Sequence, residues 1–215
     1  MAEKGEIYFQ DEASQMIANA VNLKENEIFL DVCAAPGSKV TQISNFKFQI
    51  SNLIVAGDLY WKRVKILQEN CKKQDVEFVN VLQYNAENAL PFADESFDVV
   101  LLDAPCTGTG TIRHNPEIRY FLTEKDFEEL SRKQLKILHH ASKLIKRGGR
   151  IIYSTCSLEI EENEAVAREF LAENADFEKV SPDLNEKFLT SENFARTFPP
   201  RDKTDGFFVA VFRKK

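Results

Sequence analysis

Two cysteines at the ends of strand-like segments are the residues of this chain best suited to chemistry. Cys106 lies in Asp103-Ala-Pro-Cys-Thr-Gly-Thr-Gly110, and Cys156 lies in Tyr153-Ser-Thr-Cys-Ser157. The carboxyl ends of parallel strands meet at one edge of a sheet, where ligands bind, so we expect both thiols to face one crevice. Two thiols in such places indicate covalent chemistry on a bound substrate.

The alternative for each thiol is a buried cysteine that packs and does not react. Two further cysteines fit that alternative better, because Cys33 lies at a strand end and Cys71 on the apolar face of a helix. A cysteine hydrolase would need an oriented histidine base, yet His114, His139 and His140 fall in a loop and a helix with no orienting partner evident. The sequence has no Cys-x-x-Cys or His-x-x-x-His pair, so we expect no metal site.

A third segment, Asp31-Val-Cys-Ala-Ala-Pro-Gly-Ser-Lys39, follows a strand-like run where an open α/β sheet would hold a nucleotide-like cofactor. Its small residues would let backbone N–H groups approach a ligand closely. About 20 residues further on, Asp58 is placed to accept both ribose hydroxyls, although a solvated turn residue explains that acid equally well. The sequence has no Walker lysine motif, which favours a nucleoside with a small or cationic tail over a triphosphate.

Strand-like and helix-like segments alternate along almost the whole chain and must position these motifs. This order predicts an α/β fold with a mainly parallel sheet and helices on both faces. We expect strands at 27–33, 53–58, 76–83, 97–103, 150–155, 177–180 and 206–213. We expect helices at 12–22, 39–46, 60–73, 123–149 and 161–173, with Asp11 and Thr123 at helix starts and the pair Gly148-Gly149 at a helix end. Residues 107–122 are predicted as a long loop and 181–203 as an ordered loop across the top of the sheet.

The composition fits one domain. A chain of 215 residues with 43% hydrophobic content can bury a core without disulfides, so we expect residues 1–215 to form a single domain with 1–25 as lead-in and first helix. The sequence shows neither an apolar signal region nor a run near the roughly 20 residues of a membrane span, and a cytoplasmic protein with reduced thiols is expected. The net charge of −6 argues against unaided binding to a long polyanion, while the basic residues between 132 and 150 leave room for a local phosphate contact.

Six pieces of sequence occur in a specific order along the chain. They are Gln10-Asp-Glu-Ala-Ser14, Asp31 to Lys39, Asp103 to Gly110, Asn115-Pro-Glu117, Tyr153 to Ser157 with Glu161-Glu-Asn163, and Asp205-Gly-Phe-Phe208. This set resembles the Sun/Fmu (RsmB/NSUN-like) family of RNA 5-methylcytosine methyltransferases, and the resemblance covers nearly the whole chain.

The resemblance implies a Rossmann-like methyltransferase fold with a mainly parallel seven-stranded sheet and S-adenosylmethionine as cofactor. It implies that the cofactor is held by Cys33, Ala34, Ala35, Pro36, Gly37, Ser38 and Lys39, with Asp58 on the ribose, Asn85 near the adenine and Asp103 beneath the methionine end. It also implies that Cys156 is the nucleophile, that Cys106 assists product release, and that the substrate is RNA, either rRNA or tRNA. Position alone would favour Cys106 as nucleophile, since DNA cytosine methyltransferases use a cysteine after proline.

The implied mechanism explains why two thiols are needed. Carbon 5 of cytosine is a poor nucleophile, so the Cys156 thiolate adds to carbon 6 and pushes electrons onto carbon 5, which then accepts the methyl group. Cys106 is placed to help resolve the adduct, and Asp103 to hydrogen-bond the base edge. The target base must be unpaired or flipped out of its stack.

Two positions depart from the family pattern. Ser38 stands where a second glycine is usual, and because serine is small we expect this difference to have little effect. Asn85 replaces a usual aspartate and should lower cofactor affinity. Larger family members carry a separate amino-terminal RNA-binding domain, and we expect this chain to lack one. RNA binding would then depend on a longer parent protein or on a partner in trans.

Two other functions stay open at this point. A non-catalytic factor that binds RNA or pre-ribosomes could keep the cofactor fold as a scaffold, but intact Cys106, Cys156 and Asp103 count against it. Methylation of protein or DNA is the other alternative, and the Thr-Cys thiol counts against DNA.

Overall fold

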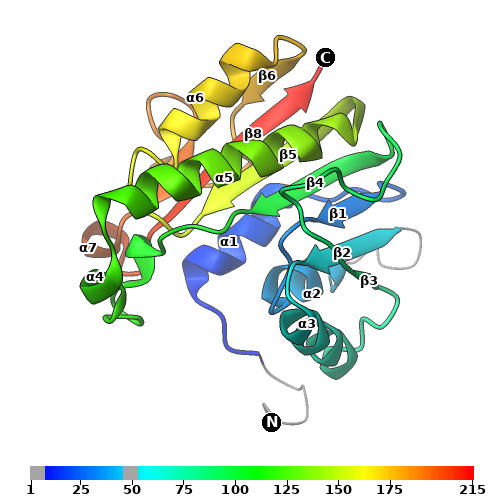
Figure 1. The fold of residues 1–215 in the computed structure, drawn as a ribbon, viewed down its shortest axis with the longest axis horizontal. Helices are drawn as coiled ribbons and strands as arrows, with labels where there is room; N and C mark the ends of the chain where they lie inside the picture. Colours follow the sequence, from blue (N-terminus) through cyan, green and yellow to red (C-terminus); the bar gives the residue numbers. More distant parts are fainter. Residues whose placement is uncertain (1–7, 46–52) are drawn as a thin grey trace.

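One mixed β-sheet forms the centre of the fold in the computed structural model, which describes residues 8–45 and 53–215 (Figure 1). The strands are β1 Phe29–Asp31, β2 Ile54–Asp58, β3 Asn80–Gln83, β4 Phe97–Asp103, β5 Ile145–Thr155, β6 Phe177–Val180, β7 Ala195–Thr197 and β8 Phe207–Lys214. They follow the order β3-β2-β1-β4-β5-β8-β6, and β7 pairs with β8 beside that path. Strands β1 to β5 pair in parallel, whereas β8 is antiparallel to β5 and β6. The predicted α/β fold with a mostly parallel sheet is confirmed.

Helices cover both faces of the sheet, as Figure 1 shows. They are α1 Glu12–Val21, α2 Ser38–Ser44, α3 Trp61–Lys73, α4 Ile118–Phe121, α5 Glu124–Lys143, α6 Glu164–Glu173 and α7 Pro199–Asp202, with 3-10 turns η2 Thr109–Thr111 and η3 Glu186–Phe188. Side chains of α5 and α6 belong to one core cluster, and those of α1, α2 and α3 belong to a second. No helix within the described residues is long and apolar enough to cross a membrane.

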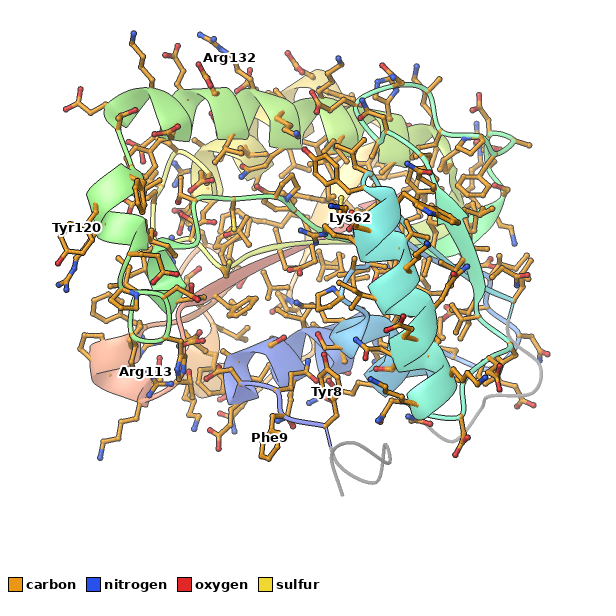
Figure 2. The ribbon with its side chains drawn as sticks, turned by 60° about the horizontal axis from the view of Figure 1, so that its bottom comes forward. Tyr8, Phe9, Lys62, Arg113, Tyr120 and Arg132 are labelled. Carbon is orange, nitrogen blue, oxygen red and sulfur yellow. The ribbon has the colours of Figure 1, made fainter. Side chains whose placement is uncertain are left out.

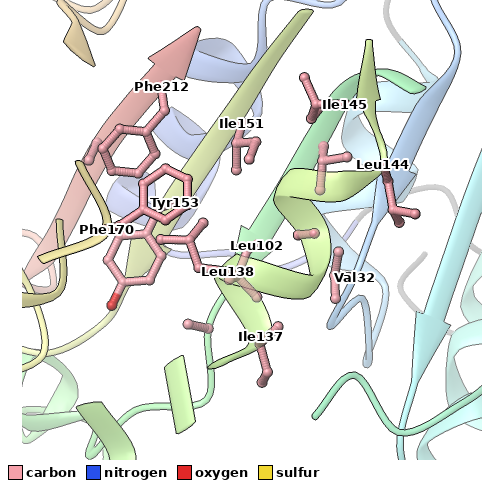
Figure 3. Close-up of a cluster of buried hydrophobic side chains, with 14 of the residues drawn as sticks. Val32, Leu102, Ile137, Leu138, Leu144, Ile145, Ile151, Tyr153, Phe170 and Phe212 are labelled. Carbon is pink, nitrogen blue, oxygen red and sulfur yellow. The ribbon is translucent and has the colours of Figure 1, made fainter. Parts of the chain in front are cut away.

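The central strand β4 buries side chains on both faces, because a parallel strand between two helix layers meets no solvent. Val100 and Leu102 join the cluster that contains α5 and α6, whereas Val99 and Leu101 join the other. This alternation follows from the two-residue repeat of a strand. Figure 3 shows part of the first cluster, with Leu102, Ile137, Leu138, Tyr153, Phe170 and Phe212. Both clusters hold the carboxyl end of β4, where the Cys106 motif begins, firmly in place.

Two predicted loops contain short regular elements. Residues 181–203 hold η3, β7 and α7, and β7 adds an eighth strand to the seven that were predicted. Residues 107–122 hold η2 and α4. The prediction of plain loops is wrong here, because elements of three or four residues are too short to show a periodic pattern.

The helix predicted from Thr123 to the glycine pair is α5, and it ends earlier, at Lys143. Ile145 already pairs with Phe97 in the sheet, so the chain has become a strand before the glycines. Gly148 has a positive φ of 78° next to a register shift between β4 and β5. The glycines therefore form an irregularity within β5 and do not cap the helix.

Other helices and strands also begin at residues that differ from the prediction. The helix predicted at 161–173 begins at Glu164, and the strand predicted at 76–83 begins at Asn80. The helix predicted at 39–46 is α2, and residue 46 lies outside the described residues. The predicted start at Asp11 is confirmed, since Asp11 Oδ1 accepts a hydrogen bond from Ala13 N–H at 2.8 Å.

Candidate active site

A cavity of about 260 Å³ lies where β1, β2, β4 and β5 end, at the edge where open α/β sheets bind ligands. Seven predicted site residues line it: Cys33, Ala35, Asp58, Asn85, Asp103, Cys106 and Cys156. The wall also contains residues that the sequence had not indicated, among them Tyr60, Arg63, Tyr84 and Lys133. Asn85 follows β3, so the fold gathers residues from five separate strand ends around one space.

The thiols of Cys106 and Cys156 meet in the wall of this cavity. Their Sγ atoms lie 3.2 Å apart, and the Cys156 N–H donates to Cys106 Sγ at 3.3 Å. Both cysteines are free and partly exposed. They come together because β4 and β5 are paired in parallel up to Asp103 and Ser154, so their following loops leave the sheet side by side.

Three of the four cysteines have a raised thiol pKa. The hydrogen bond with Cys156, together with burial, raises the pKa of the Cys106 thiol well above its usual range. Cys106 therefore keeps its proton at neutral pH and is able to donate it to the neighbouring sulfur. Burial also raises the pKa of Cys33, and it raises the pKa of Cys71 to about 11. Cys33 and Cys71 are thus poor nucleophiles.

Asp103 is held from two sides at the end of β4. Its Oδ2 accepts a hydrogen bond from Lys39 Nζ at 2.6 Å, and its Oδ1 accepts one from Ser154 Oγ at 2.8 Å. Burial alone would lower the pKa of Lys39, but the adjacent Asp103 carboxylate outweighs it and the pKa is raised. The lysine therefore stays charged and fixes the carboxylate at the cavity wall.

Asp58 is fixed in another part of the cavity wall. Its Oδ2 accepts a hydrogen bond from Ala35 N–H at 3.2 Å, and its Oδ1 lies 3.2 Å from Arg63 Nε. Arg63 also donates to the Ala35 carbonyl at 2.6 Å. Asp58 is buried, so its interpretation as a solvated turn residue is wrong.

The remaining residues of the predicted cofactor loop frame the cavity and do not line it. Ala34 N–H donates to the backbone of β2 at 2.8 Å, and the Pro36 carbonyl accepts a hydrogen bond from α3 at 2.8 Å. Gly37 precedes α2, and Ser38 is its first residue. These contacts hold Cys33 and Ala35 against the cavity.

Asp31, the last residue of β1, is buried, and within the described residues neither carboxylate oxygen has a hydrogen-bond partner. Burial, followed by repulsion from the nearby Asp103 carboxylate, raises the pKa of Asp31 to about 8. Asp31 is therefore mainly a neutral acid at neutral pH.

The loop after Cys106 is tied to both Cys156 and the last strand. Gly110 N–H donates to the Cys156 carbonyl at 2.9 Å, and Gly206 N–H donates to the Gly110 carbonyl at 2.8 Å. A Cβ at Gly110 would lie 2.3 Å from the Gly206 oxygen, so a side chain does not fit there. This contact brings the motif at 205–208 to the site.

His114 has acidic neighbours, contrary to the expectation from sequence. Its Nε2 lies 3.4 Å from Asp205 Oδ1 and 3.9 Å from Asp11 Oδ2. The possible ligand atoms of these three residues lie within 4.8 Å of one another, and Arg113 contacts both carboxylates at 3.3 and 3.5 Å. Arg113 thus supplies a positive charge to the acids. No hydrogen bond among the described residues joins His114 to a thiol, so the Cys–His pair of a hydrolase is not formed.

The short helix α4 lies beside the thiols. A Cβ on Gly108 would be 3.2 Å from Ile118 Cδ1 and 3.9 Å from Cys156 Sγ, which brings α4 close to the reactive sulfur. On the same helix Tyr120 and Phe121 are 73% and 78% exposed. Figure 2 shows Tyr120 projecting outward at one end of the molecule. The helix that approaches the loop after Cys106 through Ile118 therefore also carries an exposed aromatic surface.

Sequence reasoning missed polar residues that support the site. Arg63 gave no signal, because a charged residue on a helix is usually solvated. Glu162 and Asn163 are fully buried behind the thiols, and their one sequence signal is the Glu161-Glu-Asn163 piece of the family pattern.

The mostly parallel sheet with a cavity at its carboxyl edge belongs to the Rossmann-like class of S-adenosylmethionine-dependent methyltransferases. NSun6 from Pyrococcus horikoshii, solved with SFG, superimposes with a TM-score of 0.89 at 31% identity, over 99% of this chain and 54% of that one. The profile of the 16S rRNA methyltransferase RsmB/F family matches residues 18–213. The chain belongs to this family.

Curated relatives agree with this assignment. The probable ribosomal RNA small subunit methyltransferase B of Bacillus subtilis is 36% identical, over 99% of this chain and 49% of the relative. The ribosomal RNA small subunit methyltransferase F of Vibrio vulnificus is also 36% identical, over 98% of this chain and 46% of the relative. The chain thus spans about half the length of these relatives.

Proposed function

We propose that this chain methylates carbon 5 of a cytosine in RNA, with S-adenosylmethionine as methyl donor. Family membership supports RNA methylation in general, and the names of the relatives favour small-subunit rRNA over tRNA. The observation that carries the more specific proposal is the pair of thiols 3.2 Å apart in a ligand-sized cavity beside Asp103. Two thiols at one site suit the formation and the release of a covalent adduct.

The cavity fits the proposed cofactor. Asp58, oriented by Arg63 and by the Ala35 N–H, presents a carboxylate for the ribose hydroxyls. Asn85 would contact the adenine, and Asp103 would lie beneath the methionine end. Bound S-adenosylmethionine would supply an electrophilic methyl group. SFG, an analogue of this cofactor, in the structure of NSun6 from Pyrococcus horikoshii supports the assignment.

In this proposal Cys156 is the nucleophile. Its thiolate would form a bond to carbon 6 of the cytosine, and the ring electrons would move to carbon 5, which would accept the methyl group that the cofactor supplies. Cys106 then assists release: as the carbon–sulfur bond breaks it gives its own proton to the Cys156 sulfur, and the Cys106 thiolate that this leaves takes the proton from carbon 5. The raised pKa of Cys106 supports this division, because a thiol that keeps its proton is a better donor than nucleophile.

Asp103 and Lys39 have a second role in the proposal. Asp103 lines the cavity together with the thiols and forms an ion pair of 2.6 Å with Lys39, so its carboxylate would face the polar edge of a cytosine placed against Cys156. A fixed carboxylate next to a charged lysine can hydrogen-bond this edge and stabilise charge that develops in the ring.

The proposal is tested by transfer of labelled methyl groups to unmodified small-subunit rRNA by the wild type, Cys156→Ala and Cys106→Ala. Nucleoside analysis identifies the product, and denaturing gels detect protein bound covalently to RNA. We expect 5-methylcytidine from the wild type, no transfer from Cys156→Ala, and an accumulated adduct from Cys106→Ala. Cys71→Ala, which removes a buried thiol outside the cavity, should act as the wild type does.

Two results would contradict the proposal. Methylation at a position other than carbon 5 would exclude the reaction, and an active Cys156→Ala would exclude the nucleophile. Cofactor binding without transfer to any RNA would mean either that an RNA-binding region is missing or that the chain is a non-catalytic scaffold.

We also propose that RNA binding draws on a region or partner beyond these 215 residues. The chain carries a net charge of −6, which opposes attraction to the phosphate backbone. We expect weak RNA binding by this chain alone at about 0.2 M salt, measured by filter binding. Tight binding under those conditions would overturn this part of the proposal.

A further inference from the structure

Two adjacent residues in the turn before α6, Glu162 and Asn163, lie fully buried behind the thiols. Neither lines the cavity, so neither can touch a bound substrate. Each one is hydrogen-bonded to residues that flank one of the two reactive cysteines. Such contacts orient a thiol without taking part in bond formation.

Glu162 holds the Cys106 side. Its carboxylate accepts hydrogen bonds from the N–H of Thr107 at 2.9 Å and from the Thr107 hydroxyl. It also accepts one at 2.9 Å from the Gln134 amide, which in turn donates to the Pro105 carbonyl at 2.9 Å. The residues before and after Cys106 are therefore both tied to Glu162, one directly and one through Gln134.

Asn163 holds the Cys156 side in the same way. Its side-chain oxygen accepts a hydrogen bond from the Thr155 hydroxyl, and its amide donates to the Ser157 carbonyl at 2.9 Å. The residues before and after Cys156 are therefore both bound to Asn163. Because these groups are buried, the loss of one hydrogen bond leaves a polar atom without a partner. The resulting free-energy penalty destabilises the loop that carries the cysteine.

The two sets of contacts are largely separate. Between them the Thr107 and Ser157 hydroxyls lie 3.3 Å apart, and the thiols themselves lie 3.2 Å apart. A change on one side can thus displace one cysteine more than the other.

We propose that Glu162 and Asn163 are positioning residues with divided roles: Glu162 sets Cys106 for release of the product, and Asn163 sets Cys156 for attack on the base. This inference rests on the proposed function, because it takes the two thiols in those roles. It also gives the Glu161-Glu-Asn163 piece of the sequence a physical purpose.

A matched pair of substitutions tests the division. Thr107→Val and Thr155→Val each remove one buried hydroxyl next to one cysteine and keep the shape of the side chain. Thermal unfolding and cofactor binding of both variants serve as checks that the fold and the cofactor site remain intact. Glu162→Gln and Glu162→Ala add a second comparison, since glutamine keeps an acceptor for the Thr107 N–H and alanine does not.

The first readout needs no RNA: the rate of alkylation of each cysteine by iodoacetamide, followed by mass spectrometry. We expect Thr107→Val to change the rate at Cys106 about tenfold and to leave Cys156 near the wild-type rate, as fits the loss of one buried hydrogen bond. Thr155→Val should do the reverse. Glu162→Ala should act as Thr107→Val does, and Glu162→Gln should stay closer to the wild type.

The second readout is methyl transfer to unmodified small-subunit rRNA with denaturing gels. Thr107→Val should accumulate the covalent RNA adduct, whereas Thr155→Val should lose transfer without an adduct. Equal effects of both variants on both cysteines would overturn the division of roles. If the wild type methylates RNA at a position other than carbon 5 of cytosine, the proposed function fails, while the alkylation pattern still decides whether each residue positions one thiol.

Discussion

Lys39 Nζ lies 2.6 Å from Asp103 Oδ2, so an ion pair joins the first turn of α2 to the end of β4. Its side chains are 12% and 25% exposed. At the opposite end of β4, Lys146 and Asp98 form a second pair at 2.8 Å, with exposures of 37% and 30%. The aspartates of both pairs thus lie on β4. The more buried pair links α2, which follows the cofactor loop, to the end of β4, where the Cys106 motif begins.

Replacing Lys39 by methionine should impair both stability and activity. The change leaves the Asp103 carboxylate partly buried without its cation, and we expect the free energy of unfolding to fall by about 2 kcal/mol. Methyl transfer should fall as well, because Asp103 loses its orientation. The control Lys146→Met breaks the more exposed pair and should cost less than about 1 kcal/mol, with transfer retained. Urea unfolding and the transfer assay check this, and equal losses in both variants would contradict it.

Asp31 should make the protein less stable as pH rises. Its pKa is raised from 3.8 to about 8 in the folded state, so between these values the folded protein holds a proton that the unfolded chain has released. The free energy of unfolding therefore decreases through this range for that group. In Asp31→Asn this contribution is absent.

The measurement is urea unfolding of the wild type and Asp31→Asn at about pH 5 and about pH 8. We expect the wild type to lose more stability than the variant between these two values. An identical loss in both proteins would show that Asp31 does not carry the effect.

A methyl group at Gly110 should disrupt the site from a distance. In Gly110→Ala the new Cβ would meet the Gly206 oxygen at 2.3 Å and the Cys156 oxygen at 2.8 Å. We expect a loss of about 2 to 3 kcal/mol in unfolding free energy, because overpacked backbone must move apart. Gly148→Ala is the comparison, since its Cβ meets nothing within 4 Å and bears the strain of a positive φ alone. Its loss should be about 1 kcal/mol.

The aromatic surface of α4 should contribute to RNA binding. Tyr120 and Phe121 are exposed on α4, and the Arg119 guanidinium lies 5.1 Å from the centre of the Tyr120 ring. Nucleotides next to a base in the cavity can stack on such rings, each stack contributing about 1 to 3 kcal/mol. We expect Tyr120→Ala with Phe121→Ala to raise the KM for RNA about tenfold or more and to leave cofactor affinity unchanged.

A control for this surface is Phe78→Ala. Phe78 is 42% exposed and precedes β3, at the edge of the sheet opposite the cavity. Its replacement should leave the KM for RNA near that of the wild type. If Phe78→Ala weakens RNA use as much as the α4 variant does, stacking near the thiols is not the cause.

The sequence predicted most of what depends on local patterns. Apolar runs such as 97–103 identify buried central strands because both faces of these strands are covered. Motifs at the ends of such runs meet at one edge, so the neighbourhood of Cys106, Cys156 and Asp103 was predictable.

Contacts between distant segments were not predictable in this way. Nothing in the residues around Arg63 indicates that it clamps Asp58, and β7 is too short to show a strand pattern. Sequence reasoning placed Glu162 within a helix, whereas burial next to Thr107 keeps it in a turn where its carboxylate meets three donors. These features depend on packing of the whole fold, which a linear pattern does not contain.

The place of β8 in the sheet has a consequence for how the protein is made. This strand comes last in the sequence, yet it lies between β5 and β6, and the residue just before it, Gly206, holds the loop that follows Cys106. During synthesis, all the residues up to and including β8 must leave the ribosome before β8 can insert and that loop can reach its final position. Because domains fold as units, the two sulfur atoms should come together late in synthesis. An incompletely synthesised chain should therefore be inactive.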